Sequence, residues 1–437
     1  MRRKPNGSSV QGEVLQLTYF TRPLSRLLTR GIRSAQRSLM PRAAASRPDI
    51  VRIMHPTSYV PALLTALLAL SFSSGCLAPP NRIDGTNYSA EDDPFIASHA
   101  QRIRASDELP QQPNLIQRVV LIGDSGVPMD SEPVLAALTH WAEVDPTRTT
   151  VVFLGDNVYP AGIEKDSVAE GEEIMRKQIS ATSALRIFIP GNHDWGHVGT
   201  DRLLRQQAYV DANGAEFMPR DGCPGPTLRT IVPPTTGISR GISVIAFDID
   251  PWYFGEASVG ECPGNKTPED LGVELAKLLA ENQDQWLVVA AHHPLRTGGP
   301  HGGFSRGALF DFVTGVIYYI FGTLQDTVEE KYQTIMAPIE AGLLSAPPTL
   351  YAAGHDHNLQ VLEGDQLAGY QIVSGAGSTI RVRDGHVTDI DGTLFAHGHA
   401  GFMVVDFIRS NFGEKALLHV VETDHTAPVF SIEIGTR

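Results

Sequence analysis

The sequence predicts an α/β fold in which sheets form layers and helices pack on their faces. Short apolar runs rich in β-branched residues recur from residue 117 onward, and their length fits buried strands. Segments with the apolar spacing of helices separate these runs. Polar side chains directly follow most of the runs, and ligands of open α/β sheets bind beyond the carboxyl ends of the strands. Together these observations favour a layered fold with a site at the strand ends.

Six apolar runs account for the predicted central strands. They are RVVLIG at 118–123, TTVVFLG at 149–155, LRIFIPG at 185–191, ISVIAFD at 242–248, WLVVAA at 286–291 and TLYAAG at 349–354. Because the apolar residues are continuous rather than alternating, we expect both faces of these strands to be covered. Helices are expected at 131–144 and at 267–282. Thr267 followed by Pro268 is typical of an N-cap with proline at the first helical position.

The chain of 437 residues has a formal net charge of −14, and the charge is unevenly distributed. Residues 1–75 contain eleven of the 35 Lys and Arg residues but only two of the 49 acidic ones, which leaves 24 basic and 47 acidic residues and a net charge of −23 for the remainder. So acidic a body lacks the basic surface that nucleic-acid backbones require, and we expect no nucleic-acid partner. An anionic substrate would need a local positive centre such as a metal ion.

Residues 1–76 are predicted to be a basic extension followed by an export signal. The run VPALLTALLALSFSSGC, which ends at Cys76, has the length of a signal-peptide apolar segment and is too short for a membrane-spanning helix. Its end resembles a bacterial lipoprotein signal, which implies a lipid anchor at Cys76 and export to the bacterial cell envelope or periplasm. Met40 and Met54 are alternative starts, of which Met40 supplies the more basic leader. A transit peptide at 1–52 is the competing interpretation.

Residues 77–115 are polar and contain several prolines, so we expect a flexible tether, and the folded body is predicted at 116–437. Within the body, 303–345 is predicted as an apolar insertion, because its stretch ALFDFVTGVIYYIFGTL contains a single charged residue. This insertion is either a buried helix or an apolar lid that contacts a membrane or a lipid-like substrate. Cys223 and Cys262 fit either one disulfide or two free thiols.

Potential metal ligands follow five of the predicted strands. They are Asp124, Asp156 with Tyr159, Asn192 with His193, His292 with His293, and His355 with His357. Strand ends form one site when the strands lie side by side in a sheet, and carboxylate, amide and imidazole groups suit divalent or trivalent first-row metals. Another His-x-His pair, His397 and His399, is expected in a solvated turn instead.

The ordered blocks GDSG, GDNVY, GNHD, AAHHP and GHDH span 123–357 and resemble those of the calcineurin-like metallophosphoesterases and, within them, the purple acid phosphatases. SGAG at 374–377 is similar to a downstream segment of that family. The resemblance implies a layered β-sandwich flanked by helices, with ligands at the carboxyl ends of the strands. Two residues favour the purple branch. Gly126 stands where most relatives have histidine, and Tyr159 offers a phenolate oxygen that suits ferric iron.

The resemblance implies two metal ions, Fe(III) together with Fe(II), Zn(II) or Mn(II). Carried over, the first metal is held by Asp124, Asp156, Tyr159 and His357, and the second by Asp156, Asn192, His292 and His355. Asp156 is then shared between them. His292 is preferred to His293 because the family's ligand stands two residues before a proline. His193 and His301 are the implied catalytic residues, which give a proton to the leaving group.

The resemblance also implies the reaction. Two metal ions clamp phosphate oxygens, generate hydroxide from water and neutralise charge during in-line attack. We therefore expect a metal-dependent phosphoric monoester hydrolase, an acid phosphatase that acts on small phosphate esters. The alternatives are a phosphodiesterase for nucleotides or phospholipid headgroups, and a non-catalytic cell-surface module that binds without turnover.

Overall fold

The computed structural model describes residues 83, 85–103 and 114–436, except 128, 197–198, 237–238, 256–258, 265, 306–310, 312–314, 316–322, 380–385 and 426. The extension at 1–76 with Cys76, and most of the apolar run at 308–324, lie outside the described residues. In the part of the chain that is described, no helix is long and apolar enough to cross a membrane.

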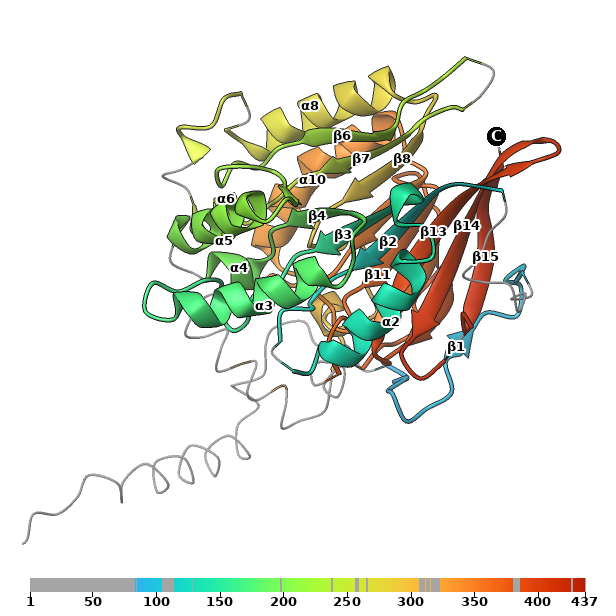
Figure 1. Ribbon diagram of the computed structural model, residues 1–437, viewed down its shortest axis with the longest axis horizontal. Coiled ribbons are helices and arrows are strands. Elements are labelled where there is room, and N and C mark those ends of the chain that lie inside the picture. Colours follow the sequence, from blue (N-terminus) through green and yellow to red (C-terminus); the bar gives the residue numbers. More distant parts are fainter. Residues whose placement is uncertain are drawn as a thin grey trace, which may run out of the picture. The chain divides into compact units, whose positions relative to one another are not determined.

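Two β-sheets form the centre of the described body (Figure 1). The eight-stranded sheet contains, in spatial order, β1 (Phe95–Ile96), β12 (Thr393–His397), β10 (Leu359–Glu363), β11 (Tyr370–Ser374), β9 (Leu350–Ala353), β8 (Trp286–Ala290), β7 (Ile242–Ala246) and β6 (Thr227–Val232). The seven-stranded sheet contains β15 (Phe430–Thr436), β14 (Gly413–Glu422), β13 (Gly401–Ser410), β2 (Leu115–Ile122), β3 (Thr149–Leu154), β4 (Leu185–Ile189) and β5 (Glu216–Phe217). Both strand orders refer to the described residues only.

All six predicted strands are present. They are β2, β3 and β4 in one sheet and β7, β8 and β9 in the other. Within each set the neighbouring strands are parallel. Their carboxyl ends therefore lie at the same edge of each sheet. The layered α/β fold predicted from the sequence is confirmed, and the body has two sets of aligned strand ends.

The two sheets pack face to face around a shared apolar core. On β8, Trp286 and Val288 face this core, whereas Leu287 and Val289 face the opposite side. This is the two-residue alternation of a strand that is covered on both faces. The ring centroid of Trp286 lies 5.6 Å from that of Phe407 on β13, a strand of the other sheet. Burial of such aromatic side chains is a large part of what holds the sheets together.

Helices cover the outer faces of both sheets (Figure 1). Apolar residues of α8 (Pro268–Glu281) and α10 (Glu330–Ser345) pack on the eight-stranded sheet. The helices α2 (Glu132–Ala142), α3 (Val168–Ser180) and α5 (Asp201–Ala212) contribute buried residues to the core of the other sheet. The short helices are α4 (Asn192–Trp195), α6 (Pro251–Phe254) and the 3₁₀ turns at Pro146–Arg148 and Pro300–Gly302.

The start of α8 follows the sequence prediction. Oγ1 of Thr267 accepts a hydrogen bond from the backbone nitrogen of Asp270 at 3.2 Å, and Pro268 is the first helical residue. This side chain satisfies one of the backbone donors that the first turn leaves unpaired.

Further along, α10 forms the C-terminal part of the insertion predicted at 303–345, and its buried face includes Ile339.

Two further contacts join segments that lie far apart in the sequence. The strand β1, within the stretch predicted as a tether, pairs antiparallel with β12 and forms the edge of the eight-stranded sheet. A disulfide joins Cys223 and Cys262, whose Cα atoms are 5.7 Å apart. It decides between the two alternatives that the sequence left open. Disulfides persist in oxidising compartments, so the bond agrees with an exported protein.

A buried ion pair links β2 to β13. The side chains of Arg118 and Asp406 are 1% and 0% exposed. Nε and Nη2 of Arg118 donate to Oδ1 and Oδ2 of Asp406 at 2.7 and 2.8 Å. Nη1 donates to the carbonyl oxygen of Trp141 at 2.9 Å, and the guanidinium lies 4.9 Å from the centroid of that ring. The pair therefore ties two neighbouring strands to the end of α2.

We predict that Asp406→Ala lowers the free energy of unfolding by about 3–5 kcal/mol, because it leaves the guanidinium of Arg118 charged and buried without its partner. The matched control is Asp211→Ala, which breaks the exposed two-bond pair with Arg220 and costs less than about 1 kcal/mol. Chemical denaturation of the wild type and both variants measures the difference. Equal unfolding free energies for the two variants would contradict the structural role of the buried pair.

Candidate metal centre

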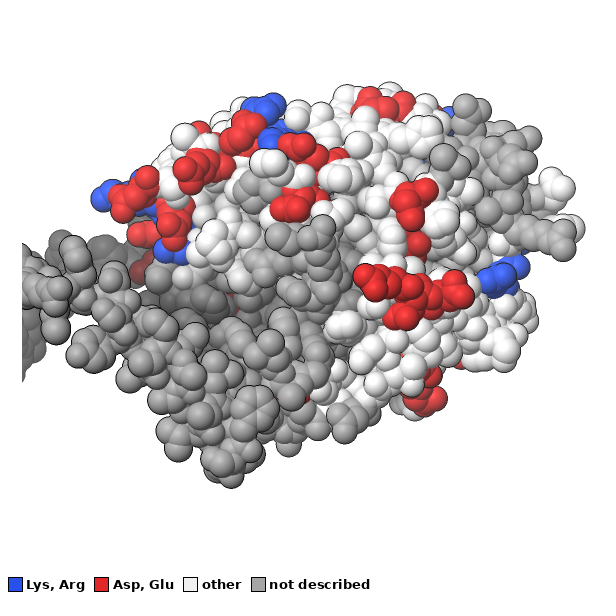
Figure 2. Space-filling model, turned by 90° about the horizontal axis from the view of Figure 1, so that it is seen from below, with Lys and Arg blue, Asp and Glu red and all other residues white. Residues whose placement is uncertain are grey.

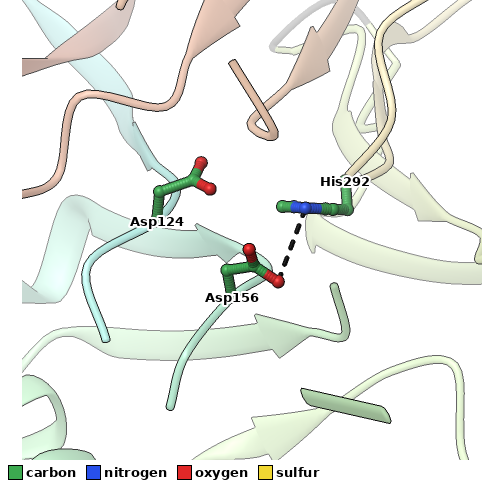
Figure 3. Close-up of side chains that lie close together, drawn as sticks. All are labelled: Asp124, Asp156 and His292. Atoms are coloured by element: carbon green, nitrogen blue, oxygen red, sulfur yellow. Dashed lines mark ion pairs between the residues drawn. The ribbon is translucent and has the colours of Figure 1, made fainter. Parts of the chain in front are cut away.

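Strand ends from both sheets meet at one place, and predicted ligands lie there. In the seven-stranded sheet, Asp124, Asp156 and Asn192 come just after β2, β3 and β4. In the other sheet, His292 and His355 come just after β8 and β9. The strands lie side by side within each sheet, as expected, and the sandwich then brings the two sets of ends together. Figure 3 shows Asp124, Asp156 and His292 facing one another, and their ligand atoms lie within 4.8 Å of one another.

The backbone at three of these residues adopts the left-handed conformation. The φ angles are 59° at Asp124, 55° at Asp156 and 72° at His355, and each residue follows a strand and a glycine. A side chain in this region is strained, and such strain concentrates at functional sites whose surroundings hold it in place. The loops also approach closely. A Cβ atom on Gly191 would lie 2.4 Å from Oδ1 of Asp156, so only glycine fits there.

The first group of ligands surrounds the phenol of Tyr159, a residue that is 6% exposed. Its hydroxyl oxygen lies 2.9 Å from Oδ1 of Asp124, 2.8 Å from Oδ2 of Asp156 and 3.2 Å from Nε2 of His357. One hydroxyl carries one hydrogen and cannot donate to two carboxylates and an imidazole at once. A cation among these four atoms would satisfy all of them, so the group fits a metal ion.

The second group surrounds Nε2 of His292. Nδ1 of this residue lies 2.8 Å from the carbonyl oxygen of Leu154, so Nδ1 carries the hydrogen of the neutral ring and Nε2 holds a lone pair. Nε2 lies 3.0 Å from Oδ1 of Asn192, 3.5 Å from Oδ1 of Asp156 and 3.3 Å from Nδ1 of His355. Oxygen and nitrogen lone pairs that face one another need a positive charge between them. This group therefore also fits a metal ion.

Asp156 belongs to both groups, since its Oδ2 faces Tyr159 and its Oδ1 faces His292. Burial on its own would raise the pKa of Asp156, but His292 and His193 outweigh burial and lower it. Burial lowers the pKa of His292, but Asp156 and Asp124 outweigh burial and raise it. The buried carboxylates thus favour positive charge in this place, and a metal ion supplies it.

Two predicted catalytic histidines border the site. Nδ1 of His193 lies 2.6 Å from the carbonyl oxygen of Pro160, and its Nε2 lies 4.0 Å from Oδ2 of the shared carboxylate. Nδ1 of His301 lies 2.8 Å from Oδ1 of Asp326, and its ring centroid is 3.8 Å from that of His355. Both side chains are partly exposed, 29% and 22%. Because an oxygen acceptor engages Nδ1 in each, Nε2 is free to exchange a proton with a bound molecule.

Asp194 is a residue of the site to which the sequence assigned no role. Its buried carboxylate accepts hydrogen bonds from the backbone nitrogens of Asn157 at 2.9 Å, Val158 at 3.1 Å and Gly191 at 2.9 Å. It therefore joins the loop after β3 to the loop after β4. The only signal for it was its place at the end of the GNHD block.

Asp356 has the corresponding role on the other side of the site. Its side chain is fully buried, and Oδ1 accepts from the backbone nitrogen of His301 at 3.1 Å. Oδ2 accepts from Oγ1 of Thr297 at 2.5 Å. The carboxylate thus holds the 297–301 loop against the block that contains His355. In the sequence it appeared only as the residue between two histidines.

Two other predictions concern histidines outside the ligand groups. His293 is 1% exposed, and its ring packs against His292 and His355 at centroid distances of 5.1 and 4.6 Å. It packs beside two of the predicted ligands without belonging to either group. The prediction of a solvated turn at His397 is wrong. His397 ends β12, is 4% exposed, and its Nδ1 lies 2.6 Å from Oε1 of Glu422. A partner distant in the sequence buries it.

A two-sheet sandwich whose strand ends bring together carboxylates, imidazoles, an amide and a phenol defines a class of metal-dependent hydrolases. Residues 117–359 match the family model described as calcineurin-like phosphoesterase, and the chain belongs to that family. The fold and the resemblance predicted from the sequence are confirmed.

The chain is similar to tartrate-resistant acid phosphatase type 5 of Mus musculus, with 26% identity over 279 residues that cover 60% of this chain and 72% of the relative. It is also similar to glideosome-associated protein 50 of Plasmodium falciparum, with 23% identity over 256 residues, 52% of this chain and 56% of the relative. A solved structure described as "GAP50 the anchor in the inner membrane complex of Plasmodium" covers 74% of this chain and 89% of its own, with 16% identity and a TM-score of 0.45. The first of these relatives agrees with the purple acid phosphatase resemblance.

Proposed function

We propose that this protein is a metal-dependent phosphoric monoester hydrolase of the acid phosphatase type. Membership of the calcineurin-like phosphoesterases supports phosphoric ester hydrolysis, and similarity to tartrate-resistant acid phosphatase type 5 supports the monoester. The observation that carries the proposal is the position of Asp156 between two groups of ligands. A carboxylate with one oxygen in each group suits a pair of metal ions that act on one phosphate.

The two groups differ in the ion that they suit. The first group contributes Asp124, Asp156, Tyr159 and His357, and the second contributes Asp156, Asn192, His292 and His355. A phenolate and two carboxylates favour Fe(III) in the first group, whereas an amide and two imidazoles favour Fe(II), Zn(II) or Mn(II) in the second. When bound, such ions supply Lewis-acid activation of water and neutralise charge on the phosphate.

The chain's own proton donors are His193 and His301. In each protonated ring, the Nδ1 hydrogen is held by an oxygen of the chain, Pro160 in one case and Asp326 in the other. The Nε2 hydrogen remains for the leaving oxygen, which becomes an alcohol as the ester bond breaks. Pro160 and Asp326 orient the rings, and Asp326 does so with a side chain that is 4% exposed.

A small phosphate ester is the substrate class that the surface favours. Acidic side chains are spread over the face shown in Figure 2, and Lys and Arg are sparse there. The chain after residue 75 has a net charge of −23. Such a surface repels long polyanions, which supports the expectation of no nucleic-acid partner. A small ester needs positive charge only at the metal centre.

The test of this function compares two esters. We expect purified protein to hold two metal ions per chain at this centre and to hydrolyse p-nitrophenyl phosphate faster than bis(p-nitrophenyl) phosphate. Asp156→Ala is the matched control, because it removes a ligand from both ions, and its metal content and activity should fall together. Elemental analysis and initial rates measure both. Faster hydrolysis of the diester would favour the phosphodiesterase, and two bound metals without either activity would favour the non-catalytic module.

A second prediction separates proton donation by His193 from its other contacts. His193→Gln should slow hydrolysis of an alkyl phosphate by about 10²–10⁴-fold, because an alkoxide leaves only with a proton. The same variant should be much less impaired on p-nitrophenyl phosphate, whose leaving group is a weak base. Rates on the two esters, each relative to the wild type, give the comparison. An equal loss on both would assign His193 to positioning alone.

A third prediction concerns Tyr159. Its phenolate on ferric iron would give a visible absorption band, and none of the other proposed ligands would. Tyr159→Phe keeps the ring and its packing while it removes the oxygen, so it isolates ligation from core volume. The iron-loaded variant should be colourless, with lower activity or a shifted pH profile. Colourless wild-type protein that contains iron after loading in air would place the site among the other two-metal phosphoesterases.

A further inference from the structure

A second cluster of potential metal ligands lies at the ends of β13 and β14 that are opposite their shared hairpin turn (Figure 1). At this end of the ladder, Gly401 pairs with Glu422. The cluster consists of His399, Glu422 and Asp424, and each offers one ligand atom within 4.8 Å of the other two. It shares no residue with the metal centre at the strand ends.

Glu422 is held in a fixed orientation at this place. It is 2% exposed, and its Oε1 lies 2.6 Å from Nδ1 of His397, while Nε2 of His397 lies 2.9 Å from the carbonyl oxygen of Asp92. With an acceptor at each nitrogen, the His397 ring carries both hydrogens. Such an outer hydrogen-bond partner is what orients the carboxylate ligands of metal sites.

The other oxygen of this buried carboxylate lacks a hydrogen-bond donor among the described residues. Oε2 of Glu422 lies 4.0 Å from Nδ1 of His399 and 3.9 Å from Nε2 of His425, which is beyond the length of a hydrogen bond. The lone pairs of this oxygen are therefore available to a cation.

The remaining donors face the same place. Nδ1 of His399 lies 3.2 Å from the carbonyl oxygen of Ala400, so its neutral ring has the lone pair on Nε2, which is 3.5 Å from Oδ2 of Asp424. Oδ1 of Asp424 lies 3.5 Å from Nε2 of His425. The cluster therefore contains two carboxylates and the imidazole of His399, and the imidazole of His425 lies beside Asp424. Three such donors, with water as the fourth, suit a four-coordinate divalent ion of the zinc type.

We propose that His399, Glu422 and Asp424 bind a divalent cation of the zinc type. The two carboxylates balance the charge of the ion, and the ion supplies the partner that Oε2 of Glu422 lacks. Bound there, it would join the turn after β12 to the loop after β14. That turn also supports the metal centre, since the backbone nitrogen of Gly401 donates to Ala376 at 3.0 Å and that of Gly377 donates to Gly123 at 3.0 Å.

The test is a zinc titration of metal-stripped full-length protein. In the wild type, calorimetry and elemental analysis should show one more equivalent of Zn²⁺ than in His399→Ala or in Asp424→Ala. Asp424 is 61% exposed, so its substitution leaves the core intact if His399→Ala impairs folding. The matched control is His99→Ala. His99 lies 3.6 Å from Glu363 in an exposed His–carboxylate pair, and this pair belongs to no cluster of three or more potential ligands among the described residues.

The same titration in the Asp156→Ala background removes the shared ligand of the strand-end centre, so that the two sites are measured apart. The proposal requires that this variant keeps one equivalent of Zn²⁺ and that adding Asp424→Ala abolishes it. Equal zinc content in the wild type, His99→Ala and Asp424→Ala would overturn it. If Asp156→Ala loses the zinc of the strand-end centre but keeps the equivalent that depends on Asp424, the second site is supported. That result does not depend on which reaction the strand-end centre performs.

Discussion

The carboxylate of Asp156 is the group on which the candidate centre depends. Each of its oxygens faces a different set of ligands, one around Tyr159 and the other around His292. A buried anion between two such sets is unfavourable unless positive charge reaches both sides. His292 faces only one of these sets, and it does not reach the side that faces Tyr159. Two ions would serve both sides, and the proposed chemistry uses two ions that act on one phosphate.

The rest of the fold holds that carboxylate in place against its own conformational preference. Asp156 has a φ angle of 55°, which costs free energy and persists only where neighbouring groups fix the loop. Asp194 fixes it by accepting three backbone hydrogen bonds from the loops after β3 and β4. Those loops rest on parallel strands, and the buried pair of Arg118 and Asp406 ties β2, the next strand, to β13. Strain at the site is thus balanced by hydrogen bonds and packing beneath it.

The same principle operates in the cluster around Glu422, on another part of the sheet. There too a histidine orients a buried carboxylate, and one oxygen is left facing imidazoles at a distance too long for hydrogen bonds. The two places differ in accessibility. Five of the seven predicted ligands of the strand-end centre are buried, whereas Asp424 of the other cluster is 61% exposed. An ion bound at the exposed cluster would connect two loops.

The sequence by itself determined the six central strands, the N-cap of α8 and the set of ligand-bearing blocks, because each is encoded by residues close together in the chain. Apolar runs of strand length and a Thr-Pro pair need no distant partner to be recognised.

Only the tertiary structure decided that the blocks divide between two sheets, that Asp194 and Asp356 hold the loops in place, and that Cys223 bonds to Cys262. It also reversed the prediction for His397, which pairs with Glu422 across 25 residues of sequence. These features depend on where separate segments meet, and burial, hydrogen bonds and disulfide geometry exist only after the sheets have packed.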